Sequence, residues 1–398
     1  MAFALRISAI FCRNYSASSP SILNTKGLPF LTSKQKSRAA LALLKSEKDP
    51  ERILQICREA SLTPESHLDR VAYTVAVEKL TATQSFAAIR EFIEEHKKRP
   101  DLQNERFMVK AILLYGKAGM LDQAIQTFKQ MGDLNLTRTV KSLNALLSSC
   151  IIAKKYKEVA RLFDEYSKDY SIKPDTVTYN TMIKALCESD SSDSALALLK
   201  EMGKKGCKPN AISYGNLLAG FYREEKFDKV GVVLDLMERN GCHPGVTTYN
   251  VRIQSLCKLK KSSEAMALIR GMVSKGVRPN TTTFYHLIYG FCREGNLEEA
   301  KKVFSEMKSR GCVPDSNCYF ALLYYLCEGG DYEPAFKLCR ESMEKDWVPS
   351  FKVMKSLVNG LVKLSKIEAA KEIIGEMKEK FPSNSEMWAT VEQGLPQH

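Results

Sequence analysis

The sequence predicts an all-α fold in which helical hairpins repeat along the chain and stack on one another. An aromatic residue and a cysteine return at multiples of 35 residues, in the segments YNTMIKALC (from Tyr179), YNVRIQSLC (from Tyr249), FYHLIYGFC (from Phe284) and YFALLYYLC (from Tyr319). Two amphipathic helical stripes separated by a polar turn fill each period. Such a unit cannot bury its apolar face alone, so the units must stack into an array.

The unit from Thr176 to Asn210 illustrates the pattern. Apolar residues at helical spacing mark its first half: Tyr179, Met182, Ile183, Leu186 and Cys187. The polar turn ESDSSD follows, and a second stripe occupies Ala195, Leu198, Leu199 and Met202. Gly206 is placed to end the second helix in a left-handed cap, and Pro209 prevents its continuation. The unit is therefore predicted to be a helical hairpin.

Nine consecutive units keep this register. They start at Arg70, Glu105, Val140, Thr176, Ala211, Val246, Thr281, Ser316 and Phe351. We expect four segments: a targeting segment and linker at 1–31, a degenerate repeat at 32–69, the nine repeats at 70–385, and a capping helix at 386–398. The capping pair Thr32 and Gln35 marks the start of the degenerate repeat. Trp388 is expected to face inward, because the last repeat needs a cover.

Small and flexible apolar residues also recur in the second half of the units, where we expect them to pack against the first helix. The small residue returns as Ala124, Ala195, Ala265, Ala300, Ala335 and Ala370. The flexible one returns as Met131, Met202, Met237, Met272, Met307 and Met377.

The twelve cysteines follow the repeat as well. One repeat position holds Cys187, Cys257, Cys292 and Cys327, and another holds Cys207, Cys242 and Cys312. No C-x-x-C pair occurs, and the five histidines do not cluster. Structural zinc sites need paired ligands at short spacing. We therefore expect buried, small hydrophobic cysteines rather than zinc ligands, and no metal or cofactor.

The charge pattern favours a polyanionic partner and an organellar address. The chain has 59 Lys and Arg against 46 Asp and Glu, a net charge of +13. Such an excess favours nucleic acid as a partner. The first acidic residue is Glu47, and Arg6 and Arg13 lie among serine and apolar residues. These features predict a mitochondrial transit peptide, with cleavage between Tyr15 and Ser16. No apolar run is long enough to span a membrane.

The repeated phrase TYN…LC…A…M…G-KPN resembles the pentatricopeptide repeat family, in its plain 35-residue type, over residues 35 to 385. Tetratricopeptide repeats are shorter and carry a tryptophan in the first helix, where this chain has none. The resemblance implies a right-handed superhelix of about ten repeats that binds single-stranded RNA at about one base per repeat. The chain looks like short plant mitochondrial members of the family, some of which are ribosomal.

In that family the fifth and last residues of a repeat select the base. The resemblance implies four usable pairs: Thr74 with Asn104, Asn144 with Asp175, Asn180 with Asn210, and Asn250 with Asn280. By family analogy the first suits adenine, the second uracil, and the other two pyrimidines. Amides offer a donor and an acceptor to a base edge. The alternative role for such asparagines is helix capping. Aliphatic second-position residues, which sandwich bases in the family, are Val71, Val177 and Ile212.

The other five units depart from the family's reading pattern. Their pairs are Val109 with Thr139, Gly215 with Gly245, Tyr285 with Asp315, Phe320 with Ser350, and Lys355 with Ser385. Tyr285 and Phe320 can stack on a base but discriminate poorly between bases. The usable pairs are therefore scattered, which disfavours a long unique RNA target.

The thirteenth residue is basic in five units, namely Lys117, Arg223, Lys258, Arg293 and Lys363. Stacked repeats would align these side chains, and phosphate contact is the favoured role, because it supplies affinity without sequence choice. The alternative is that a basic residue suits the C-terminal end of a helix.

No catalytic pattern accompanies the repeats. The H-x-E and C-x-x-C signatures of zinc deaminases are missing, and no glycine-rich nucleotide loop occurs. We therefore expect no enzyme activity, no small-molecule substrate and no membrane partner. Two functions stay open. The first is a structural component of the mitochondrial ribosome, in the small subunit for preference, with ribosomal RNA and ribosomal proteins as partners in the matrix. The second is a free factor specific for one transcript. An adaptor for proteins alone would leave the basic residues unexplained.

Overall fold

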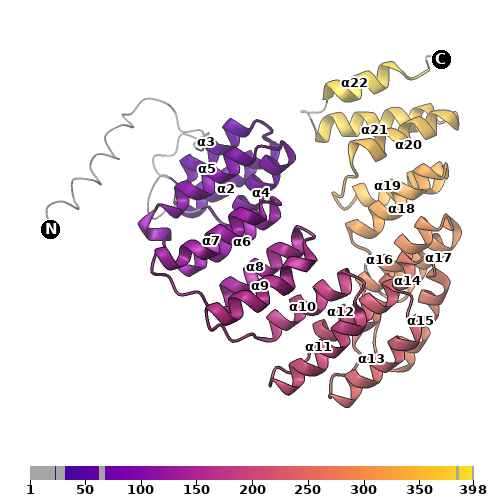
Figure 1. The fold of residues 1–398 in the computed structure, drawn as a ribbon. Coiled ribbons are helices and arrows are strands. Elements are labelled where there is room, and N and C mark those ends of the chain that lie inside the picture. The colour runs from indigo at the N-terminus through magenta and orange to yellow at the C-terminus, as the bar shows by residue number, and fades with distance from the viewer. Residues whose placement is uncertain (1–22, 24–31, 62–67, 382–384, 397–398) are drawn as a thin grey trace, which may run out of the picture. The chain divides into compact units, whose positions relative to one another are not determined.

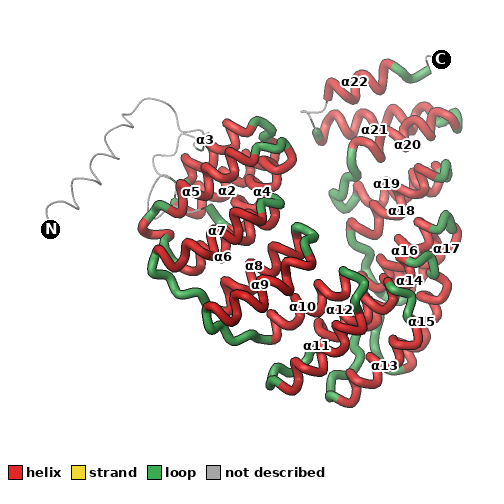
Figure 2. Tube along the Cα trace, in the orientation of Figure 1, coloured by secondary structure: helices red, strands yellow, loops and turns green. Residues whose placement is uncertain are grey.

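The computed structural model describes residues 23, 32–61, 68–381 and 385–396. Within these ranges the chain forms 21 α-helices and one short 3-10 helix, η1 (Pro100–Leu102), without any strand (Figures 1 and 2). The predicted all-α fold is confirmed. The predicted targeting segment lies outside the described residues, apart from Leu23. None of the described helices is long and apolar enough to cross a membrane.

The chain divides into two compact units, 1–185 and 186–398, here called the N-terminal and the C-terminal unit. The N-terminal unit contains α2 (Ser33–Ser46), α3 (Pro50–Ala60), α4 (Arg70–Ala82), α5 (Phe86–Lys97), α6 (Glu105–Lys117), α7 (Leu121–Asp133), α8 (Val140–Ile152), α9 (Tyr156–Asp169) and most of α10 (Thr176–Glu188).

The C-terminal unit contains the remaining helices. They are α11 (Ser192–Lys204), α12 (Ala211–Arg223), α13 (Phe227–Arg239), α14 (Val246–Lys258), α15 (Ser262–Ser274), α16 (Thr281–Arg293), α17 (Leu297–Ser309), α18 (Ser316–Glu328), α19 (Tyr332–Met343), α20 (Phe351–Lys363), α21 (Ile367–Lys380) and α22 (Ser385–Gln393). A helix begins at each of the nine repeat starts expected from the sequence.

Within each unit the helices pair as hairpins and the hairpins stack. The first helix of a repeat packs on its own second helix, as α16 does on α17, and also on the first helix of the next repeat, as α14 does on α16. The first helices thus lie side by side, with the second helices in a neighbouring row (Figure 1). This arrangement brings equivalent residues of successive repeats next to one another.

Local sequence explains where the helices stop. Gly206 follows α11 with a φ of +80°, in the left-handed region that glycine adopts without strain. The backbone N–H of Cys207 then donates to the carbonyl of Met202 at 3.0 Å. The left-handed cap predicted for Gly206 is therefore confirmed. At the start of α2, Thr32 and Gln35 form the expected capping box.

The recurring small and flexible side chains form the core of each hairpin. The six recurring alanines and six recurring methionines are all buried. The cysteines of the twelfth position are buried as well, with Cys187 at 3% and Cys257 at 4% exposure. At the end of the chain Trp388 of α22 is buried, with its ring centroid 4.8 Å from that of Phe351.

The second cysteine set corrects one expectation. Cys207, Cys242 and Cys312 are only half-buried, because they lie in the loops that follow the second helices. Periodicity alone assigned them to the core, whereas a loop residue outside the helical stripe keeps contact with solvent. Across the described part of the chain, no group of three or more His, Cys, Asp or Glu side chains could hold a metal ion.

Candidate nucleic-acid interface

The predicted reading residues lie on the first turns of the first helices and in the loops before the next first helix. Asn144 and Asp175 belong to the N-terminal unit, and Asn250 and Asn280 to the C-terminal unit. In both cases the structure brings the two members of the pair into direct contact. In each contact Nδ2 of the first residue donates to Oδ1 of the second.

In the N-terminal unit a three-residue cluster joins α8 to the start of α10. Asn144 Nδ2 donates to Asp175 Oδ1 at 3.0 Å. The hydroxyl of Thr178 donates to Asn144 Oδ1 at 2.7 Å and accepts from the backbone N–H of Asp175 at 3.1 Å. The Thr178 hydroxyl therefore fixes which way the Asn144 amide points.

The C-terminal unit repeats this cluster between α14 and α16. Asn250 Nδ2 donates to Asn280 Oδ1 at 3.2 Å, and the Thr283 hydroxyl donates to Asn250 Oδ1 at 2.6 Å. Asn280 Oδ1 also accepts from the Thr283 backbone N–H at 3.0 Å. The threonine is a member of the site that sequence reasoning missed. Its signal was the capping pattern of Asp or Asn followed three residues later by Thr.

These clusters leave capacity for a ligand. A carboxamide has two N–H donors and an oxygen with two lone pairs. In each cluster the named contacts use one donor and one lone pair of the fifth residue, so one of each is left for a base edge. Asp175 differs from Asn280 in its charge. Partial burial acts to raise the pKa of Asp175, but hydrogen bonds from Thr178 and Asn144 outweigh it and hold that pKa below its usual value.

The last residues of the other two predicted pairs, Asn104 and Asn210, cap helices. Among the described residues no hydrogen bond joins Thr74, half-buried on α4, to Asn104. Asn104 instead caps α6 by accepting from the Phe107 N–H at 3.0 Å. Asn210 caps α12 and accepts from the Ser213 N–H at 3.2 Å. Asn180 is buried, with 7% exposure. Helix capping, the alternative role, thus applies to Asn104 and Asn210, and also to Asn280.

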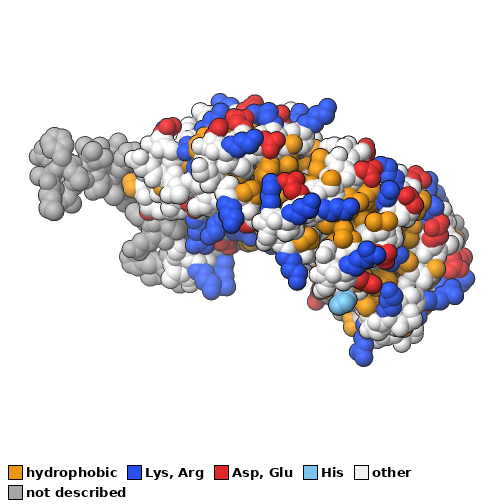
Figure 3. Space-filling view, turned by 60° about the horizontal axis from the view of Figure 1, so that its bottom comes forward, with side chains coloured by type: hydrophobic (Ala, Val, Ile, Leu, Met, Phe, Trp, Pro, Cys, Tyr) orange, Lys and Arg blue, Asp and Glu red, His pale blue; other side chains and the backbone are white. Residues whose placement is uncertain are grey.

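The aliphatic second-position residues are exposed. Val71 and Val177 are each 54% exposed and Ile212 is 60% exposed, although all three sit on regular helices. Hydrophobic side chains are visible at several places on the face shown in Figure 3, among Lys, Arg, Asp and Glu side chains. An exposed aliphatic residue beside a reading position can cover one face of a base.

Two of the five thirteenth-position basic residues are engaged by carboxylates of the preceding repeat. Lys117 Nζ lies 3.4 Å from Glu78 Oε1. Arg223 pairs with Glu188 Oε2 at 2.9 Å and with Asp190 Oδ1 at 3.1 Å. These two side chains therefore bridge repeats, and a phosphate would have to compete with the carboxylates.

The other three thirteenth-position residues lack such partners. Lys258, Arg293 and Lys363 are exposed, and none of them forms an ion pair with any residue that the structure describes. The Arg293 guanidinium lies 5.9 Å from the ring centroid of Tyr289. All three belong to the C-terminal unit, on α14, α16 and α20. Phosphate contact is thus easiest along this half of the chain.

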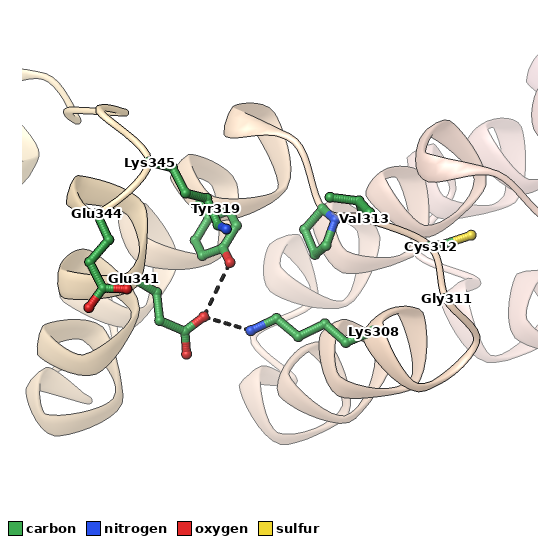
Figure 4. Close-up of a pocket in the computed structure, with 9 residues that line it drawn as sticks. Lys308, Gly311, Cys312, Val313, Tyr319, Glu341, Glu344 and Lys345 are labelled. Atoms are coloured by element: carbon green, nitrogen blue, oxygen red, sulfur yellow. Dashed lines mark hydrogen bonds and ion pairs between the residues drawn. The ribbon is translucent and has the colours of Figure 1, made fainter.

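A pocket of about 350 Å³ lies among α17, the following loop, α18 and α19 (Figure 4). Lys308 and Tyr319 both point to the carboxylate of Glu341, Lys308 Nζ at 2.6 Å and the Tyr319 hydroxyl at 3.2 Å. Because these polar groups satisfy one another, they fasten neighbouring repeats together.

Two family models match segments of the chain. The model of the PPR repeat family matches residues 138–188, 174–223, 210–258, 244–293 and 281–328, and the model of the PPR repeat matches 112–136 and 353–380. A mitochondrial pentatricopeptide repeat-containing protein of Arabidopsis thaliana is 52% identical over 191 residues, 48% of this chain and 46% of its own length.

Two further known proteins are similar to this chain. The small ribosomal subunit protein mS78 of Arabidopsis thaliana is 40% identical over 169 residues, which is 42% of each chain. The chain thus matches less than half the length of these curated relatives. The crystal structure of the pentatricopeptide repeat protein PPR10 from maize matches 95% of this chain and 53% of that one, with a TM-score of 0.52 and 21% identity. That likeness concerns the fold.

Proposed function

Because this chain belongs to the pentatricopeptide repeat family, we propose that it is an RNA-binding protein of plant mitochondria and a structural component of the small subunit of the mitochondrial ribosome. It supports translation without catalysing a reaction, and its partners are ribosomal RNA and ribosomal proteins. The similarity to the small ribosomal subunit protein mS78 supports this role.

The observation that carries the proposal is the balance between phosphate and base contacts. Lys258, Arg293 and Lys363 are exposed on the first helices α14, α16 and α20 without ion pairs to described residues, whereas five of the nine units carry no usable reading pair. Phosphate contacts supply affinity without sequence choice. A protein with such contacts can bind the RNA that lies next to it in an assembly. It then needs little ability of its own to distinguish one RNA sequence from another.

The alternative function is a free factor for one transcript, acting in RNA processing, stability or translation. The matched clusters around Asn144 and Asn250 favour it, because their amides are oriented by fixed hydrogen bonds. Oriented donors and acceptors are what a selective base contact requires. The two functions differ in where the protein resides, which makes them separable.

Location is part of the same proposal. The acid-free N-terminal segment with Arg6 and Arg13 and the mitochondrial relatives support import into the mitochondrial matrix. A fluorescent fusion of the full chain should colocalise with a mitochondrial marker, and a fusion that starts at Thr32 should not. Fluorescence of the full-length fusion in chloroplasts or cytosol would contradict the proposal.

Sucrose-gradient sedimentation of plant mitochondrial lysate tests the ribosomal role. The tagged protein should sediment with the small subunit after magnesium chelation separates the subunits, and it should stay there in high salt. Sedimentation with the large subunit would move the assignment to that subunit. Recovery in the light fractions with one enriched transcript would replace the ribosomal role by the transcript-specific one.

A further inference from the structure

Two neighbouring first helices carry aromatic side chains at the fifth position, where four other repeats carry a short polar residue. In α16 the rings of Tyr285 and Tyr289 stack with centroids 6.0 Å apart and planes inclined by 24°. Arg293 follows one turn later, with its guanidinium 5.9 Å from the Tyr289 centroid. The spacing of four residues places all three on one face of the helix.

The next first helix, α18, extends this surface. Tyr325 meets Tyr289 edge-on, at 6.0 Å between centroids and 76° between planes, and Tyr324 meets Tyr325 at 5.0 Å and 87°. Phe320, at the fifth position of its repeat, is half-buried on the same helix. We call Tyr285, Tyr289, Phe320, Tyr324 and Tyr325 the aromatic patch.

Packing between the helices does not bury the aromatic patch completely. Tyr289 is 38% exposed, although its neighbours Ile288 and Gly290 are buried. The reading cluster of Asn250, Asn280 and Thr283 ends at the beginning of α16, and the next two fifth positions are Tyr285 and Phe320. The binding chemistry of this surface therefore changes from oriented hydrogen bonds to aromatic faces within the C-terminal unit.

The charges around the aromatic patch suit a polyanion. Lys258 and Arg293 are exposed on α14 and α16 without ion pairs to described residues. Beyond α18, a groove of about 720 Å³ between α20 and α22 is lined by Lys355, Asn359 and Lys363 together with apolar side chains. One acidic residue, Glu328, lies at the end of α18. Aromatic faces between cations are the arrangement with which proteins hold single-stranded nucleic acids.

We propose that the aromatic patch is a stacking site for consecutive unpaired RNA bases, which it holds by their faces without hydrogen bonds that read their edges. The bases stack on the exposed ring of Tyr289 and on the half-buried rings beside it on α16 and α18, and Arg293 and Lys258 contact the phosphates beside them. Purines bind better than pyrimidines, because they offer a larger face to a tyrosine ring. This inference rests on the proposed RNA-binding function and adds the mode of binding in these two repeats.

The test uses the full chain with three probes of equal length and charge: oligoadenylate, oligouridylate, and an abasic ribose-phosphate strand. The double variant Tyr285→Leu/Tyr289→Leu removes the rings, and Tyr285→Phe/Tyr289→Phe keeps them without the hydroxyls. Phe227→Leu is the matched control, because Phe227 is also 38% exposed but lies on α13, a second helix. Circular dichroism establishes that each variant is folded.

The leucine pair should weaken oligoadenylate binding about tenfold, within the range that loss of one stacked base gives, and oligouridylate binding less. It should leave the abasic strand unaffected, and the phenylalanine pair and the control should bind like the wild type. An equal loss on the abasic strand, or no loss on oligoadenylate, would overturn the stacking site. A wild-type chain that binds none of the probes would instead refute the RNA-binding function itself. If the leucine pair binds RNA normally but leaves the ribosomal fraction, the patch docks a protein and the inference is wrong.

Discussion

A Cβ atom on Gly290 of α16 would lie 2.6 Å from Sγ of Cys257 on α14, and 2.5 Å from Oγ of Ser262. The same relationship links Gly220 to Cys187, again at 2.6 Å. The recurring cysteine is thus a small buried side chain that fills the space above a glycine of the next repeat. In the N-terminal unit the two roles are exchanged. There the glycine, Gly116, holds the twelfth position of its repeat, and the small side chain that faces it is Ser149 of the next repeat. One of the two facing residues must be small, because otherwise the two first helices could not pack this closely.

Gly290→Ala should destabilise the C-terminal unit. A methyl group at this position overlaps Cys257 and Ser262, and overpacking of this kind costs about 1 to 3 kcal/mol. Gly271→Ala is the matched control, since a Cβ there meets no atom within 4 Å, and replacing a helical glycine by alanine stabilises by up to about 1 kcal/mol. Urea unfolding followed by circular dichroism measures both. If the two variants shift the midpoint equally, the close contact between repeats is not what limits this position.

Thr283→Val should loosen the reading cluster in the C-terminal unit. The valine cannot donate to Asn250 Oδ1 or accept from the Asn280 backbone N–H, and each lost hydrogen bond costs about 1 kcal/mol. Thr283→Ser should keep both bonds, and Thr282→Val serves as the neighbouring exposed control. Unfolding midpoints measure the stability, and filter binding with RNAs that differ at one base measures the selectivity. A serine variant as impaired as the valine variant would show that the methyl group, and not the hydroxyl, matters.

The basic positions should differ in their effect on RNA binding. Alanine at Lys258, Arg293 and Lys363 should lower the slope of log affinity against log salt by about 2, since each phosphate contact to a single strand contributes about 0.7. Lys117→Ala with Arg223→Ala should change the slope less, because these side chains are paired with Glu78, Glu188 and Asp190. Filter binding over a salt series measures this slope for each variant.

Two results of filter binding would contradict these expectations. Equal slopes per residue in the two sets would show that the carboxylates of the preceding repeats do not compete with phosphates. A tenfold loss on one RNA sequence only, after Asn250→Ala, would correspond to about 1.4 kcal/mol of base selection and would favour the transcript-specific function.

Acid should destabilise the C-terminal unit partly through His286. Burial in α16, aided by the charge of Lys258, lowers the pKa of His286 from 6.5 to about 4. Between these values the unfolded chain binds a proton that the folded chain does not, so stability falls as the pH drops from 6.5 towards 4. His286→Gln should show a smaller loss over this interval than the wild type or the exposed-site control His243→Gln. Urea unfolding at several pH values measures it, and parallel curves for all three proteins would refute the role of His286.

Alkylation should separate the two cysteine sets. Burial raises the pKa of the Cys187 thiol to about 12 and that of Cys257 to about 11, so the reactive thiolate is scarce. The half-buried Cys207, Cys242 and Cys312 should react with iodoacetamide first. Peptide mass spectrometry after brief labelling of the folded protein identifies the modified sites. Early labelling of Cys187 or Cys257 would contradict their burial between repeats.

Much of the fold follows from the sequence by itself. The periodic starts, such as Thr176 and Ala211, are helix starts, and the recurring Ala195 and Met202 are buried. These features depend on local helix signals and on contacts with the adjacent repeat, and both have the same period as the sequence. The family and the positions of the candidate reading residues were therefore accessible without coordinates.

Only the tertiary structure decided which candidates are available to a ligand. Lys117 and Lys258 occupy the same repeat position, yet Lys117 lies 3.4 Å from Glu78, whereas Lys258 has no ion pair with a described residue. Asn144 and Asp175 are 31 residues apart and join at 3.0 Å through a geometry that Thr178 orients. Hydrogen bonds and ion pairs require particular atoms from two repeats to meet within about 3 to 4 Å. A repeat pattern places the backbones, but the packing of neighbouring repeats determines which of those side-chain atoms meet.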